Sequence, residues 1–242
     1  MLERLLKTIK RRKAGHCTAV IVAAGKATRM QGEDKILLNI NGRSVIDHTL
    51  EVFHSSDMVD EIVIVTNSEK LGYMRSLCKT RDYKKVAAIV EGGETRVHSV
   101  MRGLDHVQNK SGLVAIHDGA RPLVPLQVIN DTIGKAISFH AAAPAIPVKD
   151  TIKSAKNHIV TSTPDRSLLY AIQTPQVFDY DLLRGALQHA LDHDIGITDD
   201  CSAVEAIGMS VYLSHGSEEN IKITTPLDVI IAEAIMKRRG TL

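Results

Sequence analysis

The feature that most constrains the fold is a repeated alternation of short apolar runs with longer segments of helical periodicity. The apolar runs lack polar alternation, as expected of strands buried on both faces of a parallel sheet. They cover residues 18–23, 61–65, 86–90 and 112–116. Between them, residues 44–54, 68–79 and 95–107 carry apolar side chains at helical spacing and have the length of crossover helices. The pattern predicts an α/β, Rossmann-like fold in which helices flank a mostly parallel, twisted sheet.

Later segments extend this pattern without any linker that would divide the chain. A further strand is predicted at residues 141–148, and helices are predicted at 180–193 and 227–238. The length of 242 residues then fits a single domain over residues 16–242. It is preceded by an N-terminal helical extension, residues 1–15, whose apolar face runs into a basic stretch. A docked or frayed helix is a simpler interpretation of this extension than a membrane or nucleic-acid anchor.

Composition excludes several classes of function. Thirty basic and 28 acidic side chains nearly cancel, so no nucleic acid is expected as a partner. No apolar run reaches the roughly 18 to 20 residues that span a bilayer, so no membrane is expected either. Cys17, Cys78 and Cys201 are widely spaced, which predicts neither a disulfide framework nor a zinc site. A reducing, cytoplasmic setting fits this pattern.

Residues 149–173 interrupt the pattern, because polar residues and prolines dominate and apolar residues occur only in short patches. One interpretation is a β-arm of about residues 150–173 that protrudes from the domain. A flexible surface loop is the other, and periodicity alone does not exclude it.

The clearest chemical signal directly follows the first predicted strand. The stretch Ala23-Ala-Gly-Lys-Ala-Thr-Arg-Met30 and the later Lys35 combine small residues with positive charge. Such a loop at the carboxyl end of a parallel strand exposes backbone N–H groups that can bind a phosphate. Ala27 occupies the second glycine position, so the loop is not a dinucleotide fingerprint, and it is not a Walker A loop. On its own, such a stretch is more often an ordinary strand-to-helix turn with solvated charges.

Two other charged residues, Asp118 and Lys222, occupy different kinds of position in the predicted sheet. Asp118 follows a predicted strand, so its carboxylate should lie at the carboxyl edge of the sheet, where ligands bind in open α/β folds. Its hard oxygen suits Mg²⁺ carried by a triphosphate, although a structural pairing with Arg121 is equally compatible. Lys222 lies in an apolar-polar alternation, Ile221-Lys-Ile223, that fits an ordinary edge strand with an exposed lysine. No zinc-binding spacing surrounds the histidines, and His117 fits a structural role at a strand end.

Five separated blocks of the sequence carry a further signal: Ala23–Met30 with Lys35, His117–Pro122, Thr174–Phe178, Thr198–Glu205 and Asn220–Pro226. In their residues and in their order across residues 17–237, they resemble one family of sugar-phosphate nucleotidyltransferases, the 2-C-methyl-D-erythritol 4-phosphate cytidylyltransferases. The chain departs from the family pattern in having Ala27 for a glycine, Asp34 for a proline, Ile36 for a glutamine and Gly119 for an alanine.

The resemblance implies a reaction, ligands and residue roles. The expected reaction transfers CMP from CTP to a sugar-alcohol phosphate, with Mg²⁺ or another divalent cation on Asp118 and with a homodimer formed through the arm. The implied catalytic residues are Arg29, Lys35 and Lys222; those at the nucleotide are Ala23, Ala24, Gly25, Gly92, Glu94, Ser99 and Asp118; those at the acceptor are Thr151, Arg166, Thr174 and Thr198. Two alternatives remain open, a ribitol-5-phosphate cytidylyltransferase and an inactive nucleotide-binding relative.

Overall fold

A computed structural model describes residues 15–25, 34–110 and 112–240 of the chain. The predicted N-terminal helical extension therefore lies, except for its last residue, outside the described residues. The same holds for Arg29, for which the sequence predicts a catalytic role.

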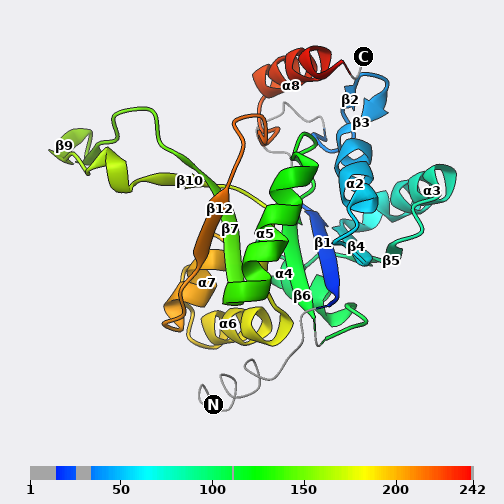
Figure 1. Cartoon of the computed structure of the whole chain (residues 1–242), viewed down its shortest axis with the longest axis horizontal. Coiled ribbons are helices and arrows are strands. Elements are labelled where there is room, and N and C mark those ends of the chain that lie inside the picture. The colour runs from blue at the N-terminus through cyan, green and yellow to red at the C-terminus, as the bar shows by residue number, and fades with distance from the viewer. Residues whose placement is uncertain (1–14, 26–33, 111, 241–242) are drawn as a thin grey trace.

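The core of the domain is an eight-stranded sheet with the order β10-β7-β11-β6-β1-β4-β5, in which β12 also pairs with β7 (Figure 1). The strands are β1 (Cys17–Ala23), β4 (Glu61–Thr66), β5 (Val86–Glu91), β6 (Leu113–Asp118), β7 (Ala141–Pro147), β10 (Tyr170–Ile172), β11 (Gln176–Asp179) and β12 (Tyr212–His215). β1 pairs in parallel with β4 and β6, and β4 pairs in parallel with β5. β10 and β11 are antiparallel to β7. The predicted α/β fold with a mostly parallel sheet is confirmed.

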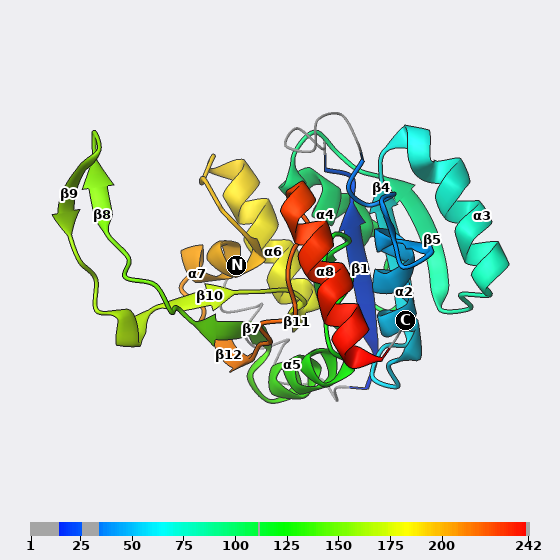
Figure 2. The same ribbon diagram turned by 90° about the horizontal axis from the view of Figure 1, so that it is seen from above.

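Helices cover both faces of this sheet (Figure 2). They are α2 (Val45–Ser55), α3 (Leu71–Arg81), α4 (Arg96–Asp105), α5 (Leu126–Phe139), α6 (Tyr180–Asp192) and α7 (Asp200–Ala206). The last helix, α8 (Pro226–Arg239), instead contributes to a smaller apolar cluster that includes Ile40 and Ile223. One core contains Ile21 of β1 together with side chains of α2, α3 and α5. The other contains Val20 with side chains of α4, α6 and α7. Adjacent residues of β1 are thus buried on opposite faces, which explains the unbroken apolar run in the sequence.

Most predicted elements are confirmed, and their ends agree within a few residues. The segment predicted as one helix at 68–79 consists of a short 3-10 helix, η1 (Ser68–Lys70), followed by α3. The sequence interpretation missed α5, although Val128, Ile129 and Ile133 are buried at helical spacing. It also missed β11, β12 and the seven-residue α7.

The region after β7 forms an arm that projects away from the domain (Figures 1 and 2). Its tip is an antiparallel hairpin of β8 (Ser154–Lys156) and β9 (Ile159–Ser162). Asn157 and His158 connect the strands with φ of 50° and 64°, the positive values of a tight hairpin turn. The chain returns through η2 (Arg166–Leu168) and joins the main sheet at β10. The predicted β-arm is confirmed, and its last residues belong to the central sheet.

A smaller hairpin precedes α2. It comprises β2 (Asn39–Ile40) and β3 (Arg43–Ser44), and it follows the segment that carries Lys35. Among the described residues, none of the helices is long and apolar enough to cross a membrane.

Candidate active site

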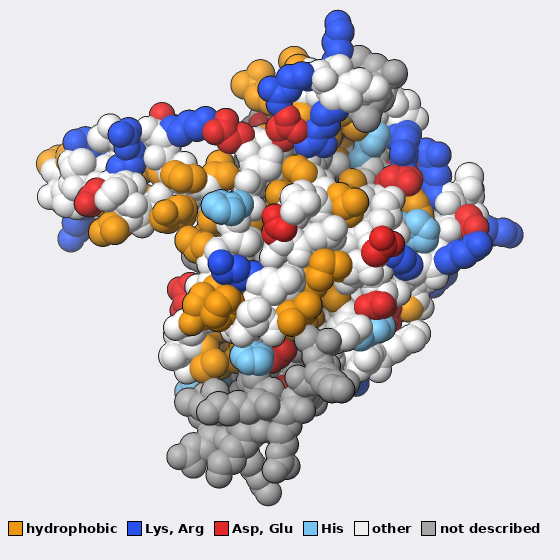
Figure 3. Space-filling model, viewed as in Figure 1, with side chains coloured by type: hydrophobic (Ala, Val, Ile, Leu, Met, Phe, Trp, Pro, Cys, Tyr) orange, Lys and Arg blue, Asp and Glu red, His pale blue; other side chains and the backbone are white. Residues whose placement is uncertain are grey.

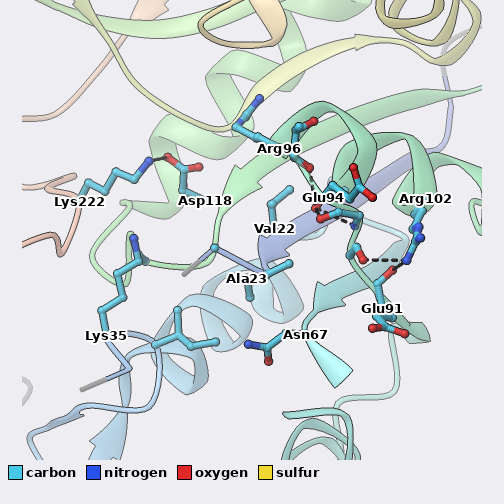
Figure 4. A pocket seen from close by; sticks show the side chains of 18 residues that line it. Val22, Ala23, Lys35, Asn67, Glu91, Glu94, Arg96, Arg102, Asp118 and Lys222 are labelled. Atoms are coloured by element: carbon cyan, nitrogen blue, oxygen red, sulfur yellow. Dashed lines mark hydrogen bonds and ion pairs between the residues drawn. The ribbon is translucent and has the colours of Figure 1, made fainter. Parts of the chain in front are cut away.

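A pocket of about 690 Å³ opens at the carboxyl ends of β1, β4, β5 and β6 (Figure 4). This is the edge of the sheet at which the sequence predicts ligand binding. Nine of the predicted site residues line it: Ala23, Ala24, Gly25, Lys35, Gly92, Glu94, Ser99, Asp118 and Lys222. The parallel strands therefore bring residues from the two ends of the chain to one cavity.

On one side of the pocket, the loop after β5 packs tightly against the loop after β1. A Cβ atom on Gly92 would lie 2.4 Å from the Cβ of Ala24 and 2.8 Å from the Oγ of Ser99. Real Cβ atoms do not approach other atoms so closely, so the position requires glycine. The Ser99 hydroxyl accepts the N–H of Gly93 at 3.1 Å, and Arg102 donates to the carbonyl of Gly92 at 2.7 Å. Side chains of α4 therefore fix the backbone of both Gly92 and Gly93.

The amino end of α4 also opens onto this side. Thr95 caps the helix by accepting the N–H of His98. Arg96 follows it and forms a bidentate pair with Asp200 at 2.9 and 2.6 Å. Burial alone would lower the pKa of Arg96, but the charge and hydrogen bonds of Asp200 outweigh burial and raise it. A fixed cation therefore faces the pocket from α4 (Figure 4).

On the opposite side, Lys222 and Lys35 extend toward the carboxylate of Asp118 (Figure 4). The Nζ of Lys222 lies 2.9 Å from Oδ2 of Asp118, and the Nε of Arg121 lies 3.5 Å from the same oxygen. Burial by itself raises the pKa of Asp118, but Lys222, Arg96 and Arg121 outweigh it and lower the pKa to about 2. Asp118 is therefore an ionised carboxylate at the wall of a cavity that also contains cations. The pairing with Arg121 that the sequence left open is present.

The strand end beneath Asp118 is held by His117. Its Nδ1 lies 3.0 Å from Oγ1 of Thr174, and its Nε2 lies 3.3 Å from the carbonyl oxygen of Arg121. The Thr174 hydroxyl in turn accepts the N–H of Asp118 at 3.2 Å. His117 is fully buried, and burial lowers its pKa to about 3. These contacts support the structural role predicted for this histidine.

The remaining predicted residues lie elsewhere. Thr174 is buried behind Asp118 and does not line the pocket. Thr198 is exposed just before α7. Thr151 and Arg166 are exposed on the arm, where Arg166 donates to the carbonyl oxygen of Lys149 at 2.7 Å. Neither residue lines the pocket.

Several pocket residues were not predicted. Asn67 and Glu91 stand at the carboxyl ends of β4 and β5, and Arg96 and Arg102 belong to α4. The rule that selected Asp118, polar residues directly after a buried parallel strand, would have found the first two. The pairing of Arg96 with Asp200 has no signature in the sequence, because it joins distant residues.

Comparison with known proteins identifies the family to which the chain belongs. Residues 17–238 match the family model for IspD, 2-C-methyl-D-erythritol 4-phosphate cytidylyltransferase. The protein of that name from Alkaliphilus oremlandii is 42% identical over 226 residues, which cover 92% of this chain and 95% of that protein. The one from Clostridium novyi is 42% identical over 226 residues, covering 92% and 97%.

Solved structures of the same group share the fold. The 4-diphosphocytidyl-2C-methyl-D-erythritol synthase of Anaerococcus prevotii aligns with a TM-score of 0.83 and 30% identity, covering 96% of this chain and 99% of that one. The 2-C-methyl-D-erythritol 4-phosphate cytidylyltransferase of Thermus thermophilus aligns with a TM-score of 0.72 and 29% identity, covering 90% and 98%. The chain belongs to the 2-C-methyl-D-erythritol 4-phosphate cytidylyltransferase family of nucleotidyltransferase enzymes.

Proposed function

We propose that the pocket described above is where this enzyme transfers the cytidylyl group of CTP to 2-C-methyl-D-erythritol 4-phosphate. The products are 4-diphosphocytidyl-2-C-methyl-D-erythritol and pyrophosphate, in the non-mevalonate route to isoprenoid precursors. One observation carries the assignment of the site: Lys35 and Lys222, from opposite ends of the chain, line a single cavity beside an ionised Asp118.

The two sides of the pocket suit the two parts of CTP. The tightly packed backbone around Ala24 and Gly92 is suited to the base, because backbone groups approach closely where no side chain intervenes. Glu94 and Ser99 belong to the same side. Lys35 and Lys222, on the other side, are suited to the triphosphate. We assign a further phosphate contact to Arg29 on the basis of its motif.

The chemistry requires little from acid-base catalysis. The acceptor phosphate has a second pKa of about 6, so it is largely a dianion near neutral pH and is already nucleophilic. One of its oxygens forms a bond to the α-phosphorus of CTP, and the bond from that phosphorus to the oxygen bridging the β-phosphorus breaks. Pyrophosphate leaves with that electron pair. The enzyme must therefore hold two anions together and stabilise charge on the α-phosphoryl oxygens.

Lys222 is placed to perform this role. Its ammonium lies 2.9 Å from Asp118, and more than a third of its side chain is exposed toward solvent. It is therefore oriented by a carboxylate and remains accessible to a phosphate oxygen. Lys35 faces the same region from the segment before α2 (Figure 4). Together these residues supply preorganised positive charge.

The donor set fits a divalent cation that arrives with the nucleotide. Mg²⁺ in nucleotide sites is held by one or two carboxylates together with phosphate oxygens and water. Asp118 supplies one ionised carboxylate at the pocket wall. The described part of the chain contains no cluster of three or more His, Cys, Asp or Glu residues that could hold a metal ion alone. When bound on Asp118, Mg²⁺ would neutralise part of the polyphosphate charge.

We further propose that the enzyme is a homodimer formed through the arm. A two-stranded hairpin alone is marginally stable in water, and this one exposes Ile159 and Val160 at 71% and 57% of their surface. Leu168, in η2 of the same arm, is 76% exposed. Figure 3 shows hydrophobic side chains at the surface of the arm. A second chain would cover them, and an exchanged arm would bring Thr151 and Arg166 to the acceptor phosphate.

Removing residues 152–164 tests this assembly, since β10 would still complete the sheet. The intact protein should show twice its chain mass of 26.4 kDa in light scattering, and the shortened protein should show the single mass. A monomeric intact protein, or a shortened one that stays dimeric, would contradict the proposal.

The setting is proposed to be the cytoplasm. Cys17, Cys78 and Cys201 are all free thiols, as a reducing compartment would maintain them.

The assignment of the lysines is tested by Lys35→Ala and Lys222→Ala, with pyrophosphate release from CTP as the assay. Each should lower kcat by about 10²-fold, the typical loss for one preorganised charge, while far-ultraviolet circular dichroism stays unchanged. Lys84→Ala is the matched control, because that lysine is 78% exposed and is not part of the pocket lining. Near wild-type kcat in either pocket variant would refute the assignment. Running the assay also with ribitol 5-phosphate identifies the acceptor.

A further inference from the structure

The segment that presents Lys35 is tied to another part of the fold by an ion pair. Asp34, directly before Lys35, pairs with Lys70. Lys70 lies in η1, just beyond the carboxyl end of β4, and only 6% of its surface is exposed. The family motif has proline at the position of Asp34, and proline cannot form this pair. The pair is therefore not a general feature of the motif.

Asp34 also organises the backbone that follows Lys35. Its Oδ1 accepts the N–H of Ile36 at 3.2 Å, and its carbonyl oxygen accepts the N–H of Leu37 at 2.9 Å. Ile36 is 3% exposed, and its carbonyl oxygen accepts the N–H of Ile46 at 3.0 Å, at the start of α2. The backbone of Lys35 is therefore flanked by two anchored residues.

We propose that the Asp34–Lys70 ion pair is a positioning device that sets the location of Lys35 in the pocket. A buried ammonium without a partner is costly, so Lys70 holds the carboxylate of Asp34 firmly. The carboxylate in turn holds the turn from which Lys35 extends. Lys70 does not line the pocket, so it acts on the reaction only through this turn.

The inference rests on the proposed function, in which Lys35 stabilises the transferred phosphoryl group. Such stabilisation depends on placement, since a displacement of about 1 Å can reduce rate by about 10²-fold. If the turn were loose, the ammonium of Lys35 would be placed less precisely in the pocket. The ion pair supplies the rigidity that the missing proline would otherwise give the backbone.

Two substitutions separate the charge from the rest of the turn. Asp34→Asn keeps an oxygen to accept the N–H of Ile36 but removes the charge that binds Lys70. Lys70→Met keeps the length of the buried side chain and removes its charge. Each should lower kcat by about tenfold or more and change KM for CTP by less than about threefold.

The decisive measurement repeats both substitutions in a Lys35→Ala background. A device that acts through Lys35 has nothing left to position there, so neither substitution should lower kcat further. Asp82→Asn and Lys84→Met are matched controls, because they remove an exposed ion pair of 3.1 Å outside the pocket. Both controls should retain wild-type kcat. Thermal unfolding verifies that each variant is folded, and Asp34→Asn decides the question if Lys70→Met does not fold.

The outcomes are distinct. Equal losses in the wild-type and Lys35→Ala backgrounds would show a general structural effect and overturn the inference. Wild-type kcat for Asp34→Asn, when Lys35→Ala is impaired, would overturn the inference and leave the proposed function intact. Wild-type kcat for Lys35→Ala itself would overturn both.

Discussion

Two loops approach each other closely at Gly92, so the addition of a single methyl group there should have a large effect on activity. In Gly92→Ala the added Cβ would lie 2.4 Å from the Cβ of Ala24. Carbon atoms in contact are ordinarily about 3.5 to 4.0 Å apart, so one of the two loops must move by about 1 Å. Both loops line the pocket, and the contact with Ser99 at 2.8 Å blocks retreat toward α4.

The displacement should reduce activity more than stability. A shift of about 1 Å in the groups that position a substrate can cost about 10²-fold in rate, equivalent to about 2.7 kcal/mol of transition-state stabilisation. Overpacking by one methyl group should lower the free energy of unfolding by about 1 to 3 kcal/mol. The variant should therefore stay folded, and kcat/KM for CTP should fall by about 10²-fold.

The assay is initial-rate pyrophosphate release at varied CTP concentration, together with urea unfolding. Gly134→Ala is the matched control, since a Cβ there meets nothing within 4 Å and the residue lies within α5. That control should keep wild-type kinetics and be slightly more stable, because alanine favours a helix over glycine. A Gly92→Ala enzyme with wild-type kcat/KM would refute the proposed packing of the nucleotide side.

Two further predictions concern buried ionisable groups. Burial alone would raise the pKa of Asp47, but hydrogen bonds from Arg43, Tyr83 and Arg81 outweigh it and lower the pKa from 3.8 to about 2. Asp47→Ala should therefore cost about 3 to 5 kcal/mol at neutral pH, and its difference from wild type in urea unfolding should shrink as pH falls from about 4 toward 2. A constant difference down to pH 2 would contradict this. Burial lowers the pKa of His117 from 6.5 to about 3, so its ring should stay neutral in NMR titrations down to about pH 4, and a midpoint between 5 and 7 would contradict the buried environment. Since the unfolded chain binds a proton near pH 6.5, the stability due to neutral His117 should be fully present above that pH and decline as pH falls toward 3.

The amino-acid sequence by itself determined the layers of the fold. Strands buried on both faces must be apolar throughout, so β1, β4 and β6 could be recognised from composition along the chain. β5 was recognised by the same apolar pattern, but it is an edge strand that is only partly buried. Elements with weaker local signatures were missed. β12 has three of its four residues exposed, and α7 spans only seven residues.

Part of the site was also determined locally, because residues after parallel strands must meet at one edge of the sheet. That rule and the motif resemblance selected Asp118, Gly92 and the loop after β1. Only the tertiary structure placed Lys222 at 2.9 Å from Asp118, paired Arg96 with Asp200, and joined Asp34 to Lys70. These contacts join residues from separate elements, and their partners are chosen by the packing of helices on the sheet. Local sequence patterns therefore do not predict these pairs.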